Sequence, residues 1–187
     1  MAEVLFLRHG ESRLTEEGLV CGHLDPPLSA KGIASARAAA AKLRGIHFDK
    51  VLSSPLKRCK MTLTEAGFPV FTVDPGLIEI NFGKYDGRPY EELVPSWHTT
   101  GIVDWSSADL SDGDDVQEFF DRAGKKLISL LDDPADRILA GSHYGFIGSA
   151  IASVSGKTKS EIFEYPIRPA SVVLVRRESG KITVKML

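Results

Sequence analysis

Arginine, histidine and glycine stand together at positions 8, 9 and 10, directly after an apolar run at residues 4–7. Such a run predicts a strand that is buried on both faces, and a parallel sheet opens its ligand crevice where its strands end. Arg8 can bind two phosphate oxygens, His9 can act as a nucleophile, and Gly10 lets the backbone approach a bound group closely. The triplet indicates phosphoryl chemistry on a histidine, although charged residues also follow strands simply because the chain reaches solvent.

Two further charged groups follow the same pattern. Residues 137–141 predict a strand that runs into His143, and an apolar helix is predicted over 146–154. Arg58 lies in the first turn of a helix predicted over 56–66, where the helix dipole disfavours a cation, so a shared anion would explain its place. Taken singly, His143 is better explained as a structural histidine, and Arg58 as a member of a surface ion pair.

Strands and helices alternate along the chain. One helix is predicted over 29–45, with Ser29 as its N-cap. Another is predicted over 114–130, with Asp114 or Asp115 as its N-cap. A shorter helix is predicted after Thr158 or Ser160. Further strands are predicted over 50–53, 70–73, 172–175 and 182–184, the last two as a hairpin. This order predicts a three-layer α/β/α sandwich around a mostly parallel sheet, with antiparallel final strands.

Three segments lack a regular pattern. Residues 18–28 and 77–87 predict loops, and Glu79 is the first acid of the second loop. We interpret residues 88–112 as short helical turns that could form a lid over a site. The two tryptophans of this segment, Trp97 and Trp105, are expected to pack in the core or the lid.

The composition is typical of one globular domain that spans residues 1–187. A net charge of −2 lacks the excess of basic residues expected for binding nucleic acid or an anionic membrane, so we expect a small-molecule partner. The first apolar run is too short for a signal peptide or a membrane span, and Cys21 and Cys59 lack metal-ligand spacing. We therefore expect a cytoplasmic protein with reduced thiols and without a metal or other cofactor.

The motifs together resemble the histidine phosphatase superfamily, the phosphoglycerate-mutase-like family, over nearly the whole chain. The resemblance rests on Arg8-His9-Gly10, on Ser54-Pro55-Leu56-Lys57-Arg58, on Glu79 ahead of Phe82-Gly83, on Ser142-His143-Tyr144-Gly145, and on the loop at 22–28 followed by Gly32. Several motifs in the right order are far more specific than any one of them.

This resemblance implies that His9 becomes a phosphohistidine, that Glu79 is the proton donor, and that His143 completes the catalytic set. It also implies that Arg8, Arg58 and His143 bind the phosphate. Guanidinium groups can neutralise a transferred phosphoryl group without a metal, and cationic neighbours favour the neutral, nucleophilic form of His9. A carboxylic acid at Glu79 can protonate the leaving alkoxide and then accept a proton from water.

The chain departs from the family pattern at three places. Thr15 stands where many members have asparagine, and we expect it to bind a phosphate oxygen with a different reach. Asp114 and Asp115 follow Gly113 where the family usually has Gly-Glu-Ser/Thr, which leaves the role of Asp115 open. Met61 stands before Thr62, where glutamine is frequent. These departures bear on the substrate contacts.

The expected function is a metal-independent phosphomonoesterase for a small ester, such as α-ribazole phosphate or a sugar phosphate, because the short segment after Glu79 is similar to those phosphatase branches. The alternative is a cofactor-dependent phosphoglycerate mutase, which usually carries an insertion there. A protein-phosphohistidine phosphatase would need an open pocket, against which a lid at 88–112 argues. A non-catalytic phosphate-binding module would be expected to have lost one of the five pocket residues. A homodimer is left open.

Overall fold

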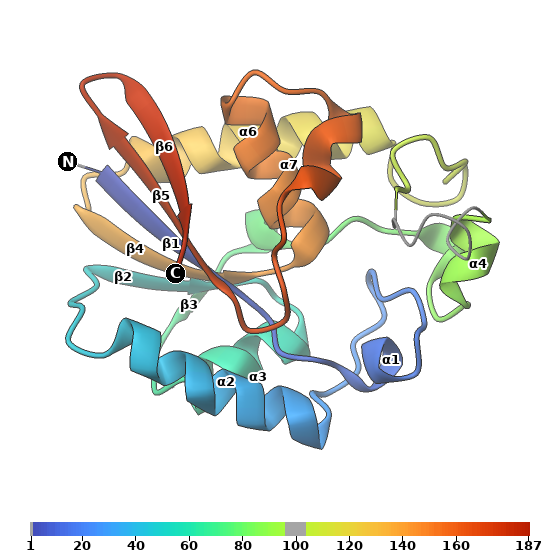
Figure 1. Ribbon diagram of the computed structural model, residues 1–187, viewed down its shortest axis with the longest axis horizontal. Coiled ribbons are helices and arrows are strands. Elements are labelled where there is room, and N and C mark those ends of the chain that lie inside the picture. Colours follow the sequence, from blue (N-terminus) through green and yellow to red (C-terminus); the bar gives the residue numbers. More distant parts are fainter. Residues whose placement is uncertain (1, 96–103) are drawn as a thin grey trace.

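The fold is built on a six-stranded sheet with the strand order β3-β2-β4-β1-β5-β6 (Figure 1). The computed structural model describes residues 2–95 and 104–187. Strands β1 to β4 run parallel to one another. Strand β5 is antiparallel to β1, and β6 is antiparallel to β5. The strands are β1 (Ala2–Arg8), β2 (Lys50–Ser53), β3 (Thr72–Val73), β4 (Arg137–Ser142), β5 (Val172–Glu178) and β6 (Lys181–Met186). The predicted mostly parallel sheet with antiparallel final strands is confirmed.

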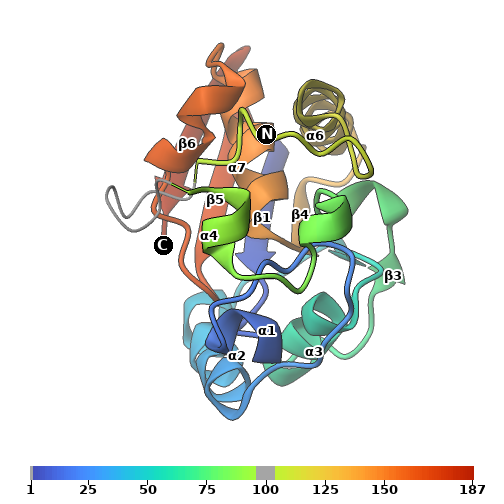
Figure 2. The same cartoon turned by 90° about the vertical axis from the view of Figure 1, so that its right-hand side faces the viewer.

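Helices cover both faces of this sheet. Helices α2 (Ala30–Leu43) and α3 (Lys57–Glu65) lie on one face, and α6 (Val116–Leu131) and α7 (Tyr144–Val154) lie on the other (Figures 1 and 2). The shorter helices are α1 (Arg13–Glu16), η1 (Pro75–Leu77), η2 (Gly83–Tyr85), α4 (Tyr90–Leu93) and η3 (Lys159–Glu164). The predicted three-layer α/β/α sandwich is therefore confirmed.

Strand β1 is buried on both faces because its side chains alternate between two hydrophobic cores. Val4 and Phe6 belong to the core beneath α6 and α7, and the rings of Phe6 and Phe146 lie 6.1 Å apart. Leu5 and Leu7 belong to the core that α2 and α3 cover. The continuous apolar run predicted such a strand correctly.

The predicted helix caps also form. The side chain of Ser29 accepts a hydrogen bond from the backbone N–H of Gly32, and that of Asp115 accepts one from Glu118. These bonds satisfy N–H groups that the first turn of a helix leaves free. Asp115 is thus the N-cap of α6, and α2 begins close to the turn that follows β1.

The structure corrects one local prediction and defines another more closely. The strand predicted over 70–73 is only Thr72–Val73, because it pairs with β2 at the sheet edge through two residues, and Val70 is 84% exposed. The helix predicted near residue 158 is the 3₁₀ helix η3, which Thr158 caps together with Glu161.

The segment 88–112 contains α4, and Trp105 within it is buried. Residues 96–103 of this segment, which include Trp97 and His98, lie outside the described residues. The lid and the single-domain organisation therefore stay predictions. Among residues 2–95 and 104–187, no helix has the length and the apolar character needed to cross a membrane.

Candidate active site

The candidate site lies at the carboxyl ends of β1 and β4. Their parallel register places Arg8 opposite Ser142, so the residues that follow each strand become neighbours. The ring centroids of His9 and His143 are 5.3 Å apart. A cavity of about 670 Å³ opens beside them, and Arg8, His9, Thr15 and Glu79 are among the residues that line it. The topology thus brings together side chains that are far apart in the sequence.

Gly10 fixes the turn after β1 against two helices. Its backbone N–H donates a hydrogen bond of 2.9 Å to the hydroxyl of Thr62 on α3. A Cβ atom at position 10 would lie 2.5 Å from the carbonyl oxygen of Gly32 on α2, far inside van der Waals contact. Glycine is therefore required here for close packing, and α2 and α3 together determine where His9 lies.

The orientation of the His9 ring is set by its own turn. Its Nδ1 atom lies 2.6 Å from the carbonyl oxygen of Gly10, which can only accept, so Nδ1 carries the hydrogen and donates it. This leaves Nε2 with a free lone pair. Burial and the nearby charges of Arg58 and Arg8 hold the pKa of His9 well below its usual value of 6.5, although the bond to Gly10 opposes them. His9 is therefore a neutral imidazole at neutral pH.

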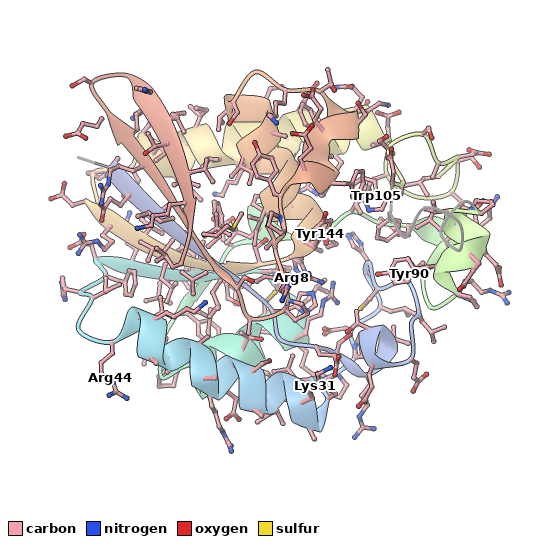
Figure 3. The ribbon with its side chains drawn as sticks, viewed as in Figure 1. Arg8, Lys31, Arg44, Tyr90, Trp105 and Tyr144 are labelled. Atoms are coloured by element: carbon pink, nitrogen blue, oxygen red, sulfur yellow. The ribbon has the colours of Figure 1, made fainter. Side chains whose placement is uncertain are left out.

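Arg8 lies between the cavity and the segment that precedes β5. Its Nη1 atom donates a hydrogen bond of 2.5 Å to the carbonyl oxygen of Ile167, and its guanidinium carbon lies 5.1 Å from the centre of the Tyr144 ring (Figure 3). Its buried Nε atom has no hydrogen-bond partner among the described residues. Arg8 therefore keeps a donor available for an anion.

Arg58 is fully buried and carries its charge beneath the site rather than on the cavity wall. Its guanidinium donates to the carbonyl oxygens of Leu24 at 2.9 Å and of Gly22 at 2.8 Å. That loop is held in turn by Asp86, whose carboxylate accepts from the backbone N–H groups of Gly22 and Leu24. The buried Nε atom of Arg58 has no hydrogen-bond partner in residues 2–95 and 104–187.

His143 is the fully buried N-cap residue of α7. Its Nε2 atom lies 2.7 Å from the hydroxyl oxygen of Ser54 and 3.4 Å from the sulfur of Cys59. Burial, followed by the charge of Arg58, holds the pKa of His143 well below its usual value. The second histidine is therefore also neutral, and Ser54 orients its ring.

Glu79 reaches the start of α7, where two backbone N–H groups bind it, and the N–H of its neighbour Ile80 is a third donor. Its carboxyl oxygens accept from Gly145 at 2.9 Å, from Phe146 at 2.9 Å and from Ile80 at 3.1 Å. Burial raises the pKa of Glu79, and the bonds from Gly145 and Ile80 and the charges of Arg58 and Arg8 counteract only part of that effect. A carboxyl group that retains its proton at higher pH than usual can act as an acid.

Thr15 lines the cavity, but its hydroxyl is already engaged. The oxygen accepts a hydrogen bond of 2.8 Å from the backbone N–H of Ser12 and donates one of 3.0 Å to the carbonyl of Ser12. These bonds belong to the capping box of α1. A contact between Thr15 and a phosphate oxygen stays a prediction.

The arrangement contains the groups that phosphoryl transfer needs. A neutral imidazole with a fixed tautomer faces a cavity that also contains a guanidinium and a carboxyl group with a raised pKa. Phosphoryl transfer depends mainly on positioning and on the neutralisation of charge, which Arg8 and the buried Arg58 supply. In the described part of the chain, no three histidine, cysteine, aspartate or glutamate side chains group as a metal site would require.

Comparison with known proteins agrees with this geometry. The model of the histidine phosphatase superfamily (branch 1) matches residues 4–187. The chain belongs to the histidine phosphatase superfamily. It is a phosphoric monoester hydrolase that acts on small phosphate esters.

Three relatives illustrate the range of this superfamily. An adenosylcobalamin/alpha-ribazole phosphatase of Escherichia coli (strain K12) is 30% identical over 169 residues, which are 86% of this chain and 83% of the relative. A protein named probable phosphoglycerate mutase from Yersinia pestis (strain Pestoides F) is 28% identical over 163 residues, 83% of this chain and 76% of the relative. The crystal structure of the alpha-ribazole phosphatase from Shigella flexneri has a TM-score of 0.82 at 26% identity and covers 99% of this chain and 95% of its own.

In this histidine phosphatase, the far wall of the cavity consists of residues that sequence reasoning did not assign to the site. The wall is largely aromatic and is formed by Phe82, Tyr90, Trp105, Tyr144, Phe163, Tyr165, Pro166 and Ile167, with Arg168. Figure 3 shows Tyr144, Trp105 and Tyr90 at the same end of the sheet as Arg8. Tyr144 directly follows His143, and this adjacency was the one signal in the sequence. His23 donates a hydrogen bond of 2.9 Å from Nε2 to the carbonyl oxygen of Glu79.

Proposed function

We propose that this phosphatase works through a phosphohistidine intermediate on His9. The observation that carries the proposal is the 2.6 Å contact between Nδ1 of His9 and the carbonyl oxygen of Gly10. Because that contact uses the hydrogen of the neutral ring, the lone pair of Nε2 is the group left to attack phosphorus.

In the first half-reaction, Nε2 of His9 forms a bond to phosphorus while the bond between phosphorus and the ester oxygen breaks. The protonated carboxyl group of Glu79 gives its proton to the leaving oxygen. Arg8 and Arg58 neutralise the charge on the transferred phosphoryl oxygens, and His143 binds them as a neutral imidazole. The products of this step are the free alcohol, phosphohistidine and the carboxylate of Glu79.

In the second half-reaction, water attacks phosphorus and gives a proton to the carboxylate of Glu79. The bond between phosphorus and Nε2 breaks, so inorganic phosphate leaves and His9 returns to its neutral form. Glu79 returns to its protonated form in the same step. One carboxyl group therefore serves both half-reactions.

The substrate we propose is a small phosphate ester, with α-ribazole phosphate or a sugar phosphate as the first candidates. The names of the relatives support the first candidate, and the largely aromatic cavity wall is suited to a leaving group that contains a flat ring. We further propose that the enzyme acts in the cytoplasm, where the buried thiols of Cys21 and Cys59 stay reduced.

The test is phosphate release from α-ribazole phosphate, sugar phosphates and an aryl phosphate in the presence of EDTA. We expect turnover by the wild-type protein and a loss of roughly three orders of magnitude or more in His9→Ala. His47→Ala, at a histidine whose side chain is 88% exposed, is the matched control and should stay active. No phosphate release from any ester would contradict the proposal.

A phosphoglycerate mutase is the second candidate, because a protein with that name is 28% identical to this chain. A mutase returns the phosphoryl group to a sugar acid instead of giving it to water. An assay with 3-phosphoglycerate and a bisphosphoglycerate primer would separate the two functions. Formation of 2-phosphoglycerate faster than free phosphate would favour the mutase.

A further inference from the structure

We propose that Arg168 is a specificity-determining residue that selects phosphate esters whose leaving group carries a carboxylate. This proposal rests on the proposed function, because it concerns the leaving group of the same reaction. Arg168 lines the cavity that also contains His9 and Arg8, and its sequence position predicted no role for it.

The guanidinium of Arg168 has no internal partner. Arg168 is exposed, and its side chain makes no hydrogen bond or ion pair with residues 2–95 or 104–187. Some exposed cations of the described residues are paired, such as Lys31 with Glu11 and Arg37 with Glu65, whereas Arg168, like Arg44, is not. The charge of Arg168 is therefore available to a bound molecule.

The backbone around Arg168 is tied to the catalytic turn. The carbonyl of Ile167 accepts from the guanidinium of Arg8, and the N–H of Ala170 donates to the carbonyl of His9. The N–H of Arg8 also donates to the carbonyl of Ser171. Bonds on both sides of Arg168 therefore hold its backbone beside the turn that carries His9.

The balance of charge favours a second anion on the substrate. Arg8 and Arg58 already match the two negative charges of a phosphate monoester. Among the described residues that line the cavity, Glu79 is the only acid, and it is engaged with three backbone N–H groups. An anionic leaving group would thus meet the charge of Arg168 without competition from a free acid among the described residues of the cavity wall.

A carboxylate fits this position better than a second phosphate. One guanidinium matches the charge and the fork geometry of one carboxylate, whereas a phosphate dianion takes two guanidinium groups at the catalytic end. The rings between the two ends support an aryl body: Trp105 and Phe163 pack edge to face at 5.3 Å, and Tyr144 lies 6.2 Å from Phe163.

The experiment compares two matched substrates, phenyl phosphate and 4-carboxyphenyl phosphate. The kcat/KM of each is measured for the wild-type protein, for R168Q and R168K, and for R44Q as a control at an exposed arginine that ends α2 far from the cavity (Figure 3). We expect the wild-type protein to prefer the carboxylate by about tenfold or more, R168Q to lose this preference through KM, and R168K to retain part of it. R44Q should keep the full preference.

A second readout makes the result independent of turnover. Calorimetry with His9→Ala and with the His9→Ala/R168Q double variant gives the Kd of both esters without hydrolysis. If R168Q abolishes the difference in Kd between the two esters, the proposal is supported even when neither ester is turned over. In that case only the proposed function has failed. Equal ratios with and without Arg168 would overturn the proposal and make Arg168 a solvated arginine at the rim, whatever the turnover of phenyl phosphate.

Discussion

Glu79 is subject to opposing influences that a carboxylate rarely meets at once. Burial favours its neutral form, whereas two backbone N–H groups at the start of α7, the N–H of Ile80 and the charges of Arg58 and Arg8 favour the ionised form. Burial wins, so the pKa of Glu79 is raised. The same donors stabilise the carboxylate that remains after the proton has left, which suits a group that gives and then takes a proton.

Glu79→Gln should therefore separate the two half-reactions. With 4-nitrophenyl phosphate the leaving group needs no proton, so His9 should be phosphorylated quickly and release about one equivalent of nitrophenolate. The later turnover should be slower than wild type by about a hundredfold, because no base activates water. Stopped-flow absorbance measures both phases, and a variant whose steady-state rate matches wild type without a burst would exclude Glu79 as the base.

The pKa shifts of His9 and Glu79 also determine how the rate depends on pH. Attack needs neutral His9, whose pKa is lowered, so activity should persist below the usual histidine pKa of 6.5 and fall only in more acidic solution. Proton donation needs neutral Glu79, whose pKa is raised, so activity should fall again as pH rises through that pKa. We expect the basic limb of the kcat profile to be absent in Glu79→Gln; an unchanged limb would assign it to another group.

At the scale of elements, the turn after β1 positions His9 because it packs against α2 and α3. Gly10→Ala would force Cβ to within 2.5 Å of the Gly32 carbonyl on α2, so the turn or the helix must move. We expect a loss of about 2 kcal/mol in the free energy of unfolding, and a larger relative loss of activity because His9 is displaced.

Denaturant unfolding and kcat of Gly10→Ala provide the check, with Gly45→Ala as the control. Gly45 has open space around its Cβ position but a φ of +76°, so alanine there should cost about 1 kcal/mol through backbone strain and leave kcat unchanged. If both variants lost only stability, the turn would not be what positions His9.

The sequence allowed these elements to be predicted because their signals are local. The apolar run before Arg8, the cap at Ser29 and the apolar spacing of α6 each act over a few residues. The aromatic wall could not be predicted, since Phe82, Trp105 and Phe163 come from separate segments, and Arg168 from the loop after η3, whose paths depend on the completed fold. Likewise, nothing local showed that Arg58 would lie beneath a loop and bind its carbonyl groups.

At the scale of the whole molecule, one end of the central strands carries catalytic groups and the other carries groups that stabilise the fold. The carboxyl ends of β1 and β4 hold the catalytic groups, and the opposite end holds a buried ion-pair cluster. There Glu3 on β1 binds Arg137 on β4 at 2.6 Å and Arg176 on β5 at 2.5 Å. The cluster joins the parallel and the antiparallel parts of the sheet through one carboxylate. A homodimer stays a prediction for measurement in solution.

Glu3→Gln should weaken the fold without changing the chemistry. Burial raises the pKa of Glu3, but its bonds to Arg137 and Arg176 outweigh that effect, and the pKa lies below its usual value. The ionised carboxylate therefore stabilises the fold above the pKa of the unfolded chain, and this contribution is lost as pH falls through the lower pKa of the folded protein. At pH 7 we expect Glu3→Gln to cost about 1–2 kcal/mol, since both arginines are partly exposed to solvent.

Urea unfolding at pH 7 and again near pH 3 tests this expectation, because the difference between the variant and the wild-type protein should shrink in acid. Glu65→Gln, which breaks the more exposed pair with Arg37, should change stability by less than about 0.5 kcal/mol. The kcat of Glu3→Gln should match wild type, since the cluster lies at the sheet end opposite His9. A stability difference that persisted at low pH would mean that Glu3 acts through packing rather than through charge.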